Sequence, residues 1–214
     1  MKLCKEHMLL YAVTDSRWLG NETLGFQVEE ALKGGVTCIQ LREKELNDRD
    51  FFNEALEIKS ICRKYNVPFI INDNVEVALK CGADGIHVGQ SDMDAGKLRR
   101  YVGDSMIIGV SAGTLEEALE AESNGADYIG TGAVFTTSTK DDANKVELET
   151  LKCICDAVSI PVVAIGGITK ENILQLSGSG VDGVAVVSAI FAQKDKSKAA
   201  FDLLNLSRKM VKGK

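Results

Sequence analysis

The chain has 214 residues, 45% of them hydrophobic, which is enough for one sizeable core in a single domain spanning residues 1–214. Its net charge of −6 and its scattered basic residues argue against a nucleic-acid binder, because such proteins concentrate positive charge on one surface. The apolar runs are far below the roughly 18 residues of a membrane span and no secretory signal pattern is evident, so we expect a soluble, cytoplasmic protein.

Eight segments have the pattern of β-strands and alternate with helical segments. They are, in chain order, 9–15, 34–41, 68–73, 82–89, 106–111, 125–132, 161–167 and 180–187. Every second segment opens on a glycine followed by Ala or Val and then Asp or Thr, which suits a helix C-cap leading into a β-branched strand. The two prolines of the chain, Pro68 and Pro161, open two of the other segments, where a missing N–H is tolerated.

The segments between these strands show helical periodicity. In 48–65, apolar side chains recur every three or four residues on one face. The segment 114–124 begins with Thr114 and has Glu117 three residues later, the spacing of a capping box.

Two architectures fit near-continuous apolar strands that alternate with helices: an open doubly wound sheet and a closed (β/α)8 barrel. The recurrence of the glycine signature in every second strand favours a closed ring with alternating layers. We therefore expect an α/β protein built as a single (β/α)8 TIM barrel.

Polar residues gather at the C-terminal ends of these strands, where a barrel enzyme builds its site. Gln40, Arg42 and Lys44 end the second strand. Because side chains alternate along a strand, these three would point the same way, with Leu41 and Glu43 pointing the other. Two cations and an amide would then converge at the barrel mouth. The alternative is that Arg42 and Lys44 simply begin a solvated loop.

Two carboxylates follow the next pair of strands. Asn72 and Asp73 end the third strand, and Asp92 follows the fourth. Adjacent parallel strands lie about 4.8 Å apart, so these carboxylates can share one hard cation. Magnesium takes one or two carboxylates and fills its other positions with water and substrate phosphate oxygens. Either Asp could instead cap the helix that follows it. Beside Arg42 and Lys44, we favour a Mg2+ site on Asp73 and Asp92 and a polyanionic ligand such as a pyrophosphate.

A second anion site is expected after the seventh and eighth strands. Gly166 and Gly167 precede a predicted helix start, where backbone N–H groups and the helix dipole can hold a phosphate. Ser188 offers its amide and hydroxyl at another helix N-terminus, and phosphate sites after these two strands recur in barrels. The glycines could instead only permit a tight turn.

Other polar residues near the mouth are less decisive. Ser111 ends the fifth strand, and the hydroxyl-rich loop 136–140 is either an active-site lid or an ordinary surface loop. His87 lies within a strand and fits a hydrogen-bonded core histidine better than a catalyst. Arg17 and Trp18, in the first loop, have no assigned role.

In combination, these motifs resemble the thiamine-phosphate synthase family, also called thiamine-phosphate pyrophosphorylase. The resemblance rests on QLREK (40–44), ND (72–73), HVGQSD (87–92) and TSTK (137–140), in the right order between about residue 9 and about residue 191. It implies a transferase of thiamine biosynthesis. That enzyme joins 4-amino-2-methyl-5-hydroxymethylpyrimidine diphosphate to 4-methyl-5-(2-phosphoethyl)thiazole, or to its carboxylated form, and releases pyrophosphate.

The resemblance also assigns residues to ligands. It implies a pyrimidine diphosphate site of Gln40, Leu41, Arg42, Glu43, Lys44, Asn72, Ser111 and Lys140, a Mg2+ site of Asp73 and Asp92, and a thiazole phosphate site of Thr137, Ser138, Thr139, Gly167, Val187 and Ser188. The expected catalytic residues are Arg42, Lys44, Lys140 and Ser111. In this family the bond to pyrophosphate is understood to break first, so Mg2+ and the cations stabilise charge on the leaving group while a lid at 133–146 excludes water.

Several alternatives stay open at this point. A thiazole tautomerase shares the fold and phosphate site but needs neither the two aspartates nor TSTK. A non-catalytic phosphate- or thiamine-binding barrel would need no metal-assisted leaving group, and an isomerase or aldolase would show a Glu base or a lysine within a strand. The expected partners are phosphorylated small molecules, and the sequence leaves homo-oligomer formation open.

Overall fold

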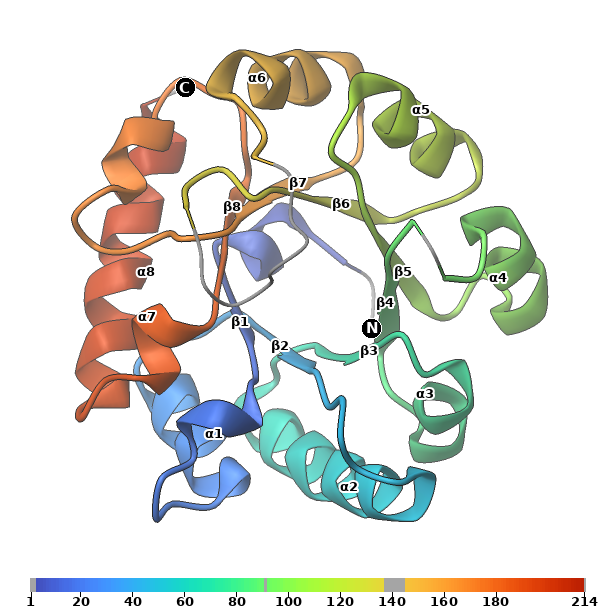
Figure 1. The fold of residues 1–214 in the computed structure, drawn as a ribbon, viewed down its shortest axis with the longest axis vertical. Coiled ribbons are helices and arrows are strands. Elements are labelled where there is room, and N and C mark those ends of the chain that lie inside the picture. Colours follow the sequence, from blue (N-terminus) through green and yellow to red (C-terminus); the bar gives the residue numbers. More distant parts are fainter. Residues whose placement is uncertain (1–2, 91, 137–144, 214) are drawn as a thin grey trace.

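In a computed structural model, the chain forms a closed parallel barrel in which each strand pairs with the next and β8 returns to β1 (Figure 1). The structure describes residues 3–90, 92–136 and 145–213. The strands are β1 (Leu10–Val13), β2 (Cys38–Leu41), β3 (Phe69–Asn72), β4 (Gly85–Val88), β5 (Ile107–Ser111), β6 (Tyr128–Thr131), β7 (Val162–Ile165) and β8 (Gly183–Val186). The predicted (β/α)8 barrel is confirmed, and the open doubly wound sheet is excluded.

Helices form a ring outside the barrel (Figure 1). The α-helices of the described residues are α1 (Leu24–Lys33), α2 (Asp48–Tyr65), α3 (Val75–Cys81), α4 (Ala95–Val102), α5 (Leu115–Ser123), α6 (Leu148–Ala157), α7 (Ser188–Phe191) and α8 (Lys196–Lys212). Short 3-10 helices are η1 (Lys5–Met8), η2 (Ser16–Trp18) and η3 (Ile173–Leu176). Within this part of the chain, no helix has the length and apolar character needed to span a membrane.

Two of these elements bear directly on the sequence predictions. The capping box expected at Thr114 and Glu117 is present at the start of α5. The helix expected directly after Gly167 is wrong, because only the four-residue η3 follows, beginning at Ile173. A single 3-10 turn that starts six residues downstream brings no helix dipole to the end of β7.

The apolar core has two layers. The outer layer packs the helices against the barrel and contains Ile39 and Leu41 of β2. The inner layer fills the barrel and consists of Met8, Tyr11, Val13, Cys38, Ile70, Ile107, Tyr128, Val163 and Ala185. Alternate residues of each strand therefore face opposite layers, as the pleat of a strand requires.

The recurring Asp or Thr of every second strand ties strands together at the base of the barrel, the end where the strands begin. Each of these side chains accepts a hydrogen bond from a backbone amide at the start of the preceding strand, and its own amide donates to the carbonyl of that same residue. The four side-chain bonds join Thr37 to Leu10 (2.8 Å), Asp84 to Phe69 (3.0 Å), Asp127 to Ile108 (2.8 Å) and Asp182 to Val162 (3.1 Å). The sequence repeat is therefore a structural device of the base rather than part of a site.

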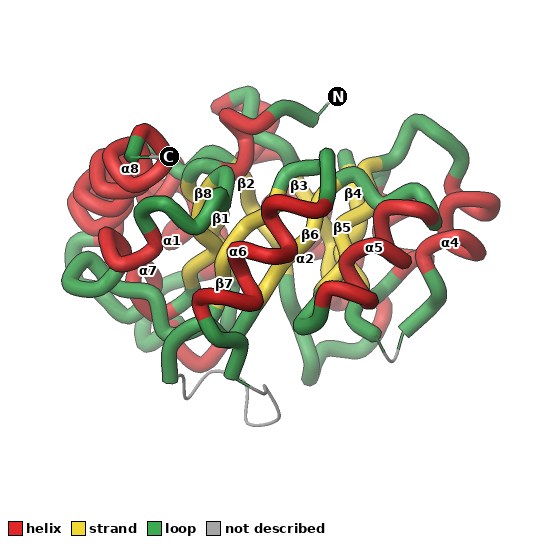
Figure 2. The backbone as a smooth tube through the Cα atoms, turned by 90° about the horizontal axis from the view of Figure 1, so that it is seen from above, coloured by secondary structure: helices red, strands yellow, loops and turns green. Residues whose placement is uncertain are grey.

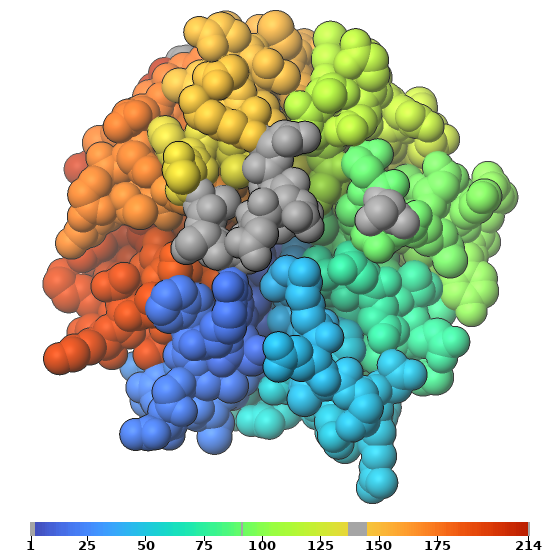
Figure 3. All heavy atoms as spheres, viewed as in Figure 1, coloured from blue at the N-terminus to red at the C-terminus, as the bar shows by residue number. Residues whose placement is uncertain are grey.

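Other contacts also close the base. Met8 of η1 is fully buried inside the barrel, and Lys5 Nζ lies 3.0 Å from Asp182 Oδ1. Figure 2 shows η1 at the end of the barrel opposite the loops that follow the strands. The polar strand ends named above therefore lie at the other end, the mouth, which is the face seen in Figures 1 and 3. Successive units follow one another in order around that face (Figure 3).

Candidate active site

The end of β2 turns Gln40 into the barrel and Leu41 away from it. Gln40 Nε2 donates a hydrogen bond to Tyr11 Oη at 2.9 Å. The Leu41 side chain is fully buried in the outer core layer. The predicted alternation holds within the strand, so only the backbone of Leu41 is available for contact with a ligand at the mouth.

Beyond β2, the three charged residues lie in a loop. The Arg42 amide donates to Thr14 Oγ1 at 3.0 Å, which fixes the start of this loop to the end of β1. Arg42 and Glu43 are half-buried, whereas Lys44 is exposed. Thr14 was not anticipated from the sequence, although a fully buried threonine at a strand end must find a hydrogen-bond partner.

The two aspartates are not helix caps. Asn74 Oδ1 accepts from Val77 N at 2.9 Å and caps α3, and Asp94 Oδ1 accepts from Lys97 N at 3.0 Å and caps α4. The capping alternative for Asp73 and Asp92 is therefore excluded. Both carboxylates remain at the mouth, which is where the metal hypothesis needs them.

Local backbone bonds hold each aspartate in place. Asp73 has a left-handed backbone with φ of 60°, its amide donates to the His87 carbonyl at 2.9 Å, and its carboxylate accepts from Asn72 Nδ2. Asp92 Oδ2 accepts from the Gly89 amide at 2.7 Å. A non-glycine residue in this region is uncommon and is typical of turns and functional sites.

The carboxyl groups of Asp73 and Asp92 interact directly. Burial, and then the charge of Asp92, raise the pKa of Asp73 to about 6. The hydrogen bond from Asn72 and the charge of Arg42 lower it. A cation shared between two neighbouring carboxylates relieves the repulsion between their charges. The pair therefore fits a hard divalent cation such as Mg2+, which takes oxygen ligands and completes its shell with water and phosphate.

A hollow of about 450 Å³ adjoins Asp73 of this pair. Its lining includes Glu43, Asn72 and Asp73. Three residues that the resemblance assigned to ligand or metal thus face one space, with Arg42 close enough to act on the charge of Asp73.

At the end of β7, two glycines are required by a close approach of the chain. Gly166 and Gly167 have φ of 103° and 61°. A Cβ on Gly167 would lie 2.3 Å from the Thr136 carbonyl oxygen, and a Cβ on Gly166 would lie 2.6 Å from Ala133 Cα. The two glycines therefore form a tight turn, and the backbone amides of this turn lie beside the loop that follows β6.

The start of α7 is as predicted. Val187 is the residue before the helix and Ser188 is its first residue. Because β7 pairs with β8, Gly167 and Ser188 end neighbouring strands. The other residues assigned to the thiazole phosphate, Thr137, Ser138 and Thr139, lie outside the described residues.

Lys140, assigned to the pyrimidine diphosphate, also lies outside them. The described arms of that loop are held at their base, where Val146 N donates to Ala133 O at 2.8 Å and Phe135 N donates to Gly166 O at 3.1 Å. The described ends of this loop therefore lie together beside Gly166.

Ser111 is bonded from two sides. Its Oγ lies 2.9 Å from His87 Nε2, and its carbonyl accepts from Gln90 Nε2 at 2.6 Å. His87 therefore contacts a candidate ligand residue instead of lying in the core alone.

In the first loop, Arg17 forms an ion pair with Asp15 at 2.7 Å, and Trp18 is exposed.

The closed parallel barrel has its polar residues at one mouth. They are an acidic pair, an arginine and the strand ends that carry Gly167 and Ser188. This is the arrangement of a (β/α)8-barrel enzyme. A sequence model described as thiamine monophosphate synthase matches residues 10–190 of the chain. The chain belongs to this family and is a transferase.

Named relatives agree with this family assignment. A thiamine-phosphate synthase of Ruminiclostridium cellulolyticum is 54% identical over 197 residues, covering 92% of this chain and 94% of the relative. One from Clostridium acetobutylicum is 52% identical over 198 residues, covering 91% and 94%. A solved structure of thiamine phosphate pyrophosphorylase from Pyrococcus furiosus superimposes with a TM-score of 0.90 at 40% identity, covering 97% of this chain and 98% of that one. The resemblance inferred from the motifs is confirmed.

Proposed function

We propose that this protein joins 4-amino-2-methyl-5-hydroxymethylpyrimidine diphosphate to 4-methyl-5-(2-phosphoethyl)thiazole, or its carboxylated form, giving thiamine phosphate and pyrophosphate. The observation that carries the proposal is the acidic pair Asp73–Asp92 beside Arg42. Helix caps supplied by Asn74 and Asp94 leave both carboxylates available. A binding barrel or a tautomerase has no leaving group that would call for this arrangement.

In the proposed reaction, negative charge builds up on the departing pyrophosphate. Arg42 and Lys44 are placed on the β2 loop, where they stabilise that charge, and Lys140 is proposed to join them. Mg2+ bound by Asp73 and Asp92 would add Lewis-acid stabilisation of the same oxygens. The Ser111 hydroxyl and the Gln40 amide would orient the pyrimidine diphosphate from the inner wall of the barrel.

The thiazole phosphate would be held at the opposite side of the mouth. The glycine turn after β7 and the amide and hydroxyl of Ser188 at the start of α7 supply N–H and O–H donors for a phosphate. Thr137, Ser138 and Thr139 of the neighbouring loop are proposed to complete this site.

The test is formation of thiamine phosphate from the two phosphorylated precursors, with and without Mg2+. We expect metal-dependent product, and we expect Asp73→Asn to lower kcat by at least ~100-fold, the scale for losing one preorganised stabiliser. Asp94→Asn is the matched control, since that carboxylate lies two residues from Asp92 and caps a helix. Because asparagine caps a helix about as well as aspartate, this variant should keep its stability and leave kcat near normal.

Two outcomes would contradict the proposal. Near-normal turnover of Asp73→Asn would remove the aspartate from the metal site. A folded protein that isomerises the thiazole but forms no thiamine phosphate would move the assignment to the tautomerase.

A further inference from the structure

A chain of hydrogen bonds crosses the inside of the barrel beneath the mouth. It runs from Gln40 on β2 to Tyr11 on β1, then to Tyr128 on β6, His87 on β4 and Ser111 on β5. The successive distances are 2.9 Å (Gln40 Nε2 to Tyr11 Oη), 2.7 Å (Tyr11 Oη to Tyr128 Oη), 2.9 Å (Tyr128 Oη to His87 Nδ1) and 2.9 Å (His87 Nε2 to Ser111 Oγ). Its two ends are residues that the proposed function assigns to the pyrimidine diphosphate.

The barrel is shaped to hold this chain. A Cβ on Gly109 would lie 2.1 Å from the Tyr128 ring, and a Cβ on Gly130 would lie 3.2 Å from the His87 ring. The two glycines lie on neighbouring strands β5 and β6 and make room for the two rings. Tyr11 and Tyr128 have at most 1% of their surface exposed, so their hydroxyl groups find partners in each other and in Gln40, His87 and Cys38.

The direction of each bond follows from the donor at one end. The Gln40 Nε2 group can only donate, so the Tyr11 oxygen accepts from it, and the Tyr11 hydrogen is assigned to the bond with Tyr128. With that assignment, the Tyr128 hydroxyl donates to His87 Nδ1. A neutral imidazole whose Nδ1 accepts carries its hydrogen on Nε2, and this hydrogen points to Ser111 Oγ. The Ser111 hydroxyl hydrogen is therefore not taken by His87.

Burial raises the pKa of both phenols well above their ordinary value of 10. Both hydroxyl groups stay protonated throughout the working pH range of an enzyme, so neither phenol carries a charge. What the chain fixes is orientation.

We propose that Tyr11, Tyr128 and His87 are positioning residues that direct the Ser111 hydroxyl hydrogen into the mouth as a donor to the bound substrate. The inference rests on the proposed function, in which Ser111 contacts the pyrimidine diphosphate. It also links the two ends of the chain: reversing the Gln40 amide would reverse every bond, place the His87 hydrogen on Nδ1 and turn the Ser111 hydrogen inward.

The first test reads the histidine tautomer directly by ¹⁵N NMR of protein labelled at histidine, without substrate. The chain has two histidines, so a His7→Gln variant assigns the spectrum. We expect His87 to be neutral with its hydrogen on Nε2 at neutral pH, and we expect Tyr128→Phe to give a mixture of tautomers. A wild-type protein with the hydrogen on Nδ1 would overturn the inference.

The second test is a double-mutant cycle of synthase kinetics. We expect Tyr128→Phe to lower kcat about 10-fold with little change in KM, the effect of misdirecting one hydrogen bond. In a Ser111→Ala background the same change should have less than about a twofold effect, because Tyr128 acts through Ser111. An undiminished 10-fold loss in that background would show a general structural role and refute the positioning role.

Tyr65→Phe is the matched control for the phenol substitution. Its hydroxyl bonds Glu29 Oε1 at 3.4 Å, at the end of α2 away from the mouth. We expect normal kcat from this variant. The two tests also separate the proposals. An inactive protein with the His87 hydrogen on Nε2 would refute the proposed function and leave the bond directions standing. An active protein with that hydrogen on Nδ1 would support the proposed function and refute the bond directions.

Discussion

The carboxyl group of Glu54 lies half-buried on α2, with Oε2 lacking a hydrogen-bond partner among the described residues. Burial first, and then the charges of Glu43 and Glu57, raise its pKa from 4.5 to about 7. A carboxyl group whose pKa is raised in the folded state stabilises the fold fully below its unfolded pKa. That contribution is lost as pH rises from 4.5 through 7.

We therefore expect Glu54→Gln to stabilise the protein at alkaline pH. Because solvent screens a half-exposed group, the gain in the free energy of unfolding at pH 8 should be about 1 kcal/mol, and it should vanish near pH 4.5. Urea denaturation at the two pH values measures it. Glu120→Gln, an exposed position on α5, is the control and should show no such pH dependence. An equal gain at both pH values would contradict the electrostatic origin.

Individual side chains show where sequence reasoning stops. Sequence spacing placed Asp73 and Asp92 on neighbouring strands, but only the structure shows that Asn74 and Asp94 supply the helix caps. Tyr11 was recognisable as a tyrosine inside an apolar strand, which must find a polar partner when buried. Its partner Tyr128 lies 117 residues away, and a contact of that range depends on barrel closure.

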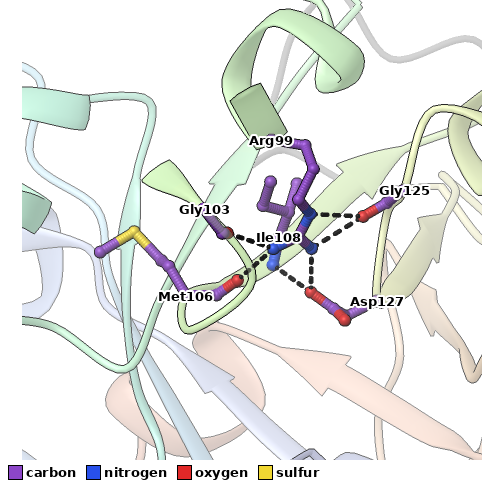
Figure 4. Close-up of polar contacts among 6 residues, drawn as sticks. All are labelled: Arg99, Gly103, Met106, Ile108, Gly125 and Asp127. Carbon is purple, nitrogen blue, oxygen red and sulfur yellow. Dashed lines mark hydrogen bonds and ion pairs between the residues drawn. The ribbon is translucent and has the colours of Figure 1, made fainter. Parts of the chain in front are cut away.

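At the scale of single elements, α4 is tied to the base by one side chain. Arg99 donates to the carbonyls of Gly103, Met106 and Gly125 and to Asp127 Oδ2 at 2.6 Å (Figure 4). Asp127 in turn accepts from the Ile108 amide. Only the planar guanidinium group can donate to all of these acceptors at once, so a lysine ammonium group cannot replace it.

We expect Arg99→Lys to lower the free energy of unfolding by about 2 kcal/mol, since the part-buried carbonyls of Met106 and Gly125 would lose their donors. Synthase kcat should be unchanged well below the melting temperature, because these contacts lie at the base. Chemical denaturation and steady-state kinetics check the two statements. Arg100→Lys, exposed on the same helix, is the control. A large loss of kcat with normal stability would show that the base and the mouth are coupled.

Strands and long helices were predictable because their periodicity is local. Expected strand segments 9–15 and 106–111 contain β1 and β5, and the expected helix 48–65 coincides with α2. The segment after β7 was mispredicted, because a glycine pair that resembles a helix start is in fact held by contacts with residues 133–136. Those contacts join segments about 30 residues apart and leave no local pattern.

For the whole molecule, the four base bridges divide the ring into pairs of strands. Each bridge joins a strand only to its successor, across 27, 15, 19 or 20 residues. The pairs are β1–β2, β3–β4, β5–β6 and β7–β8. Side-chain bridging of this kind is therefore local within each quarter of the barrel.

Native-state hydrogen exchange should reveal these quarters as separate opening units. We expect Asp127→Ala to lower the opening free energy of amides in β5 and β6 by about 1–3 kcal/mol and to leave those of β1 and β2 unchanged. Uniform loss of protection around the ring would instead show that the barrel opens only as a whole.

The quarters also divide the mouth. Gln40 and Arg42 belong to the first, Asp73 and Asp92 to the second, Ser111 to the third, and Gly167 and Ser188 to the fourth. A substrate that touches all four would join units that the side-chain bridges of the base link only in pairs, and its binding energy would appear as cooperativity of opening. Without substrate, each pair of strands would open separately. With substrate bound, the whole barrel would open in one cooperative step.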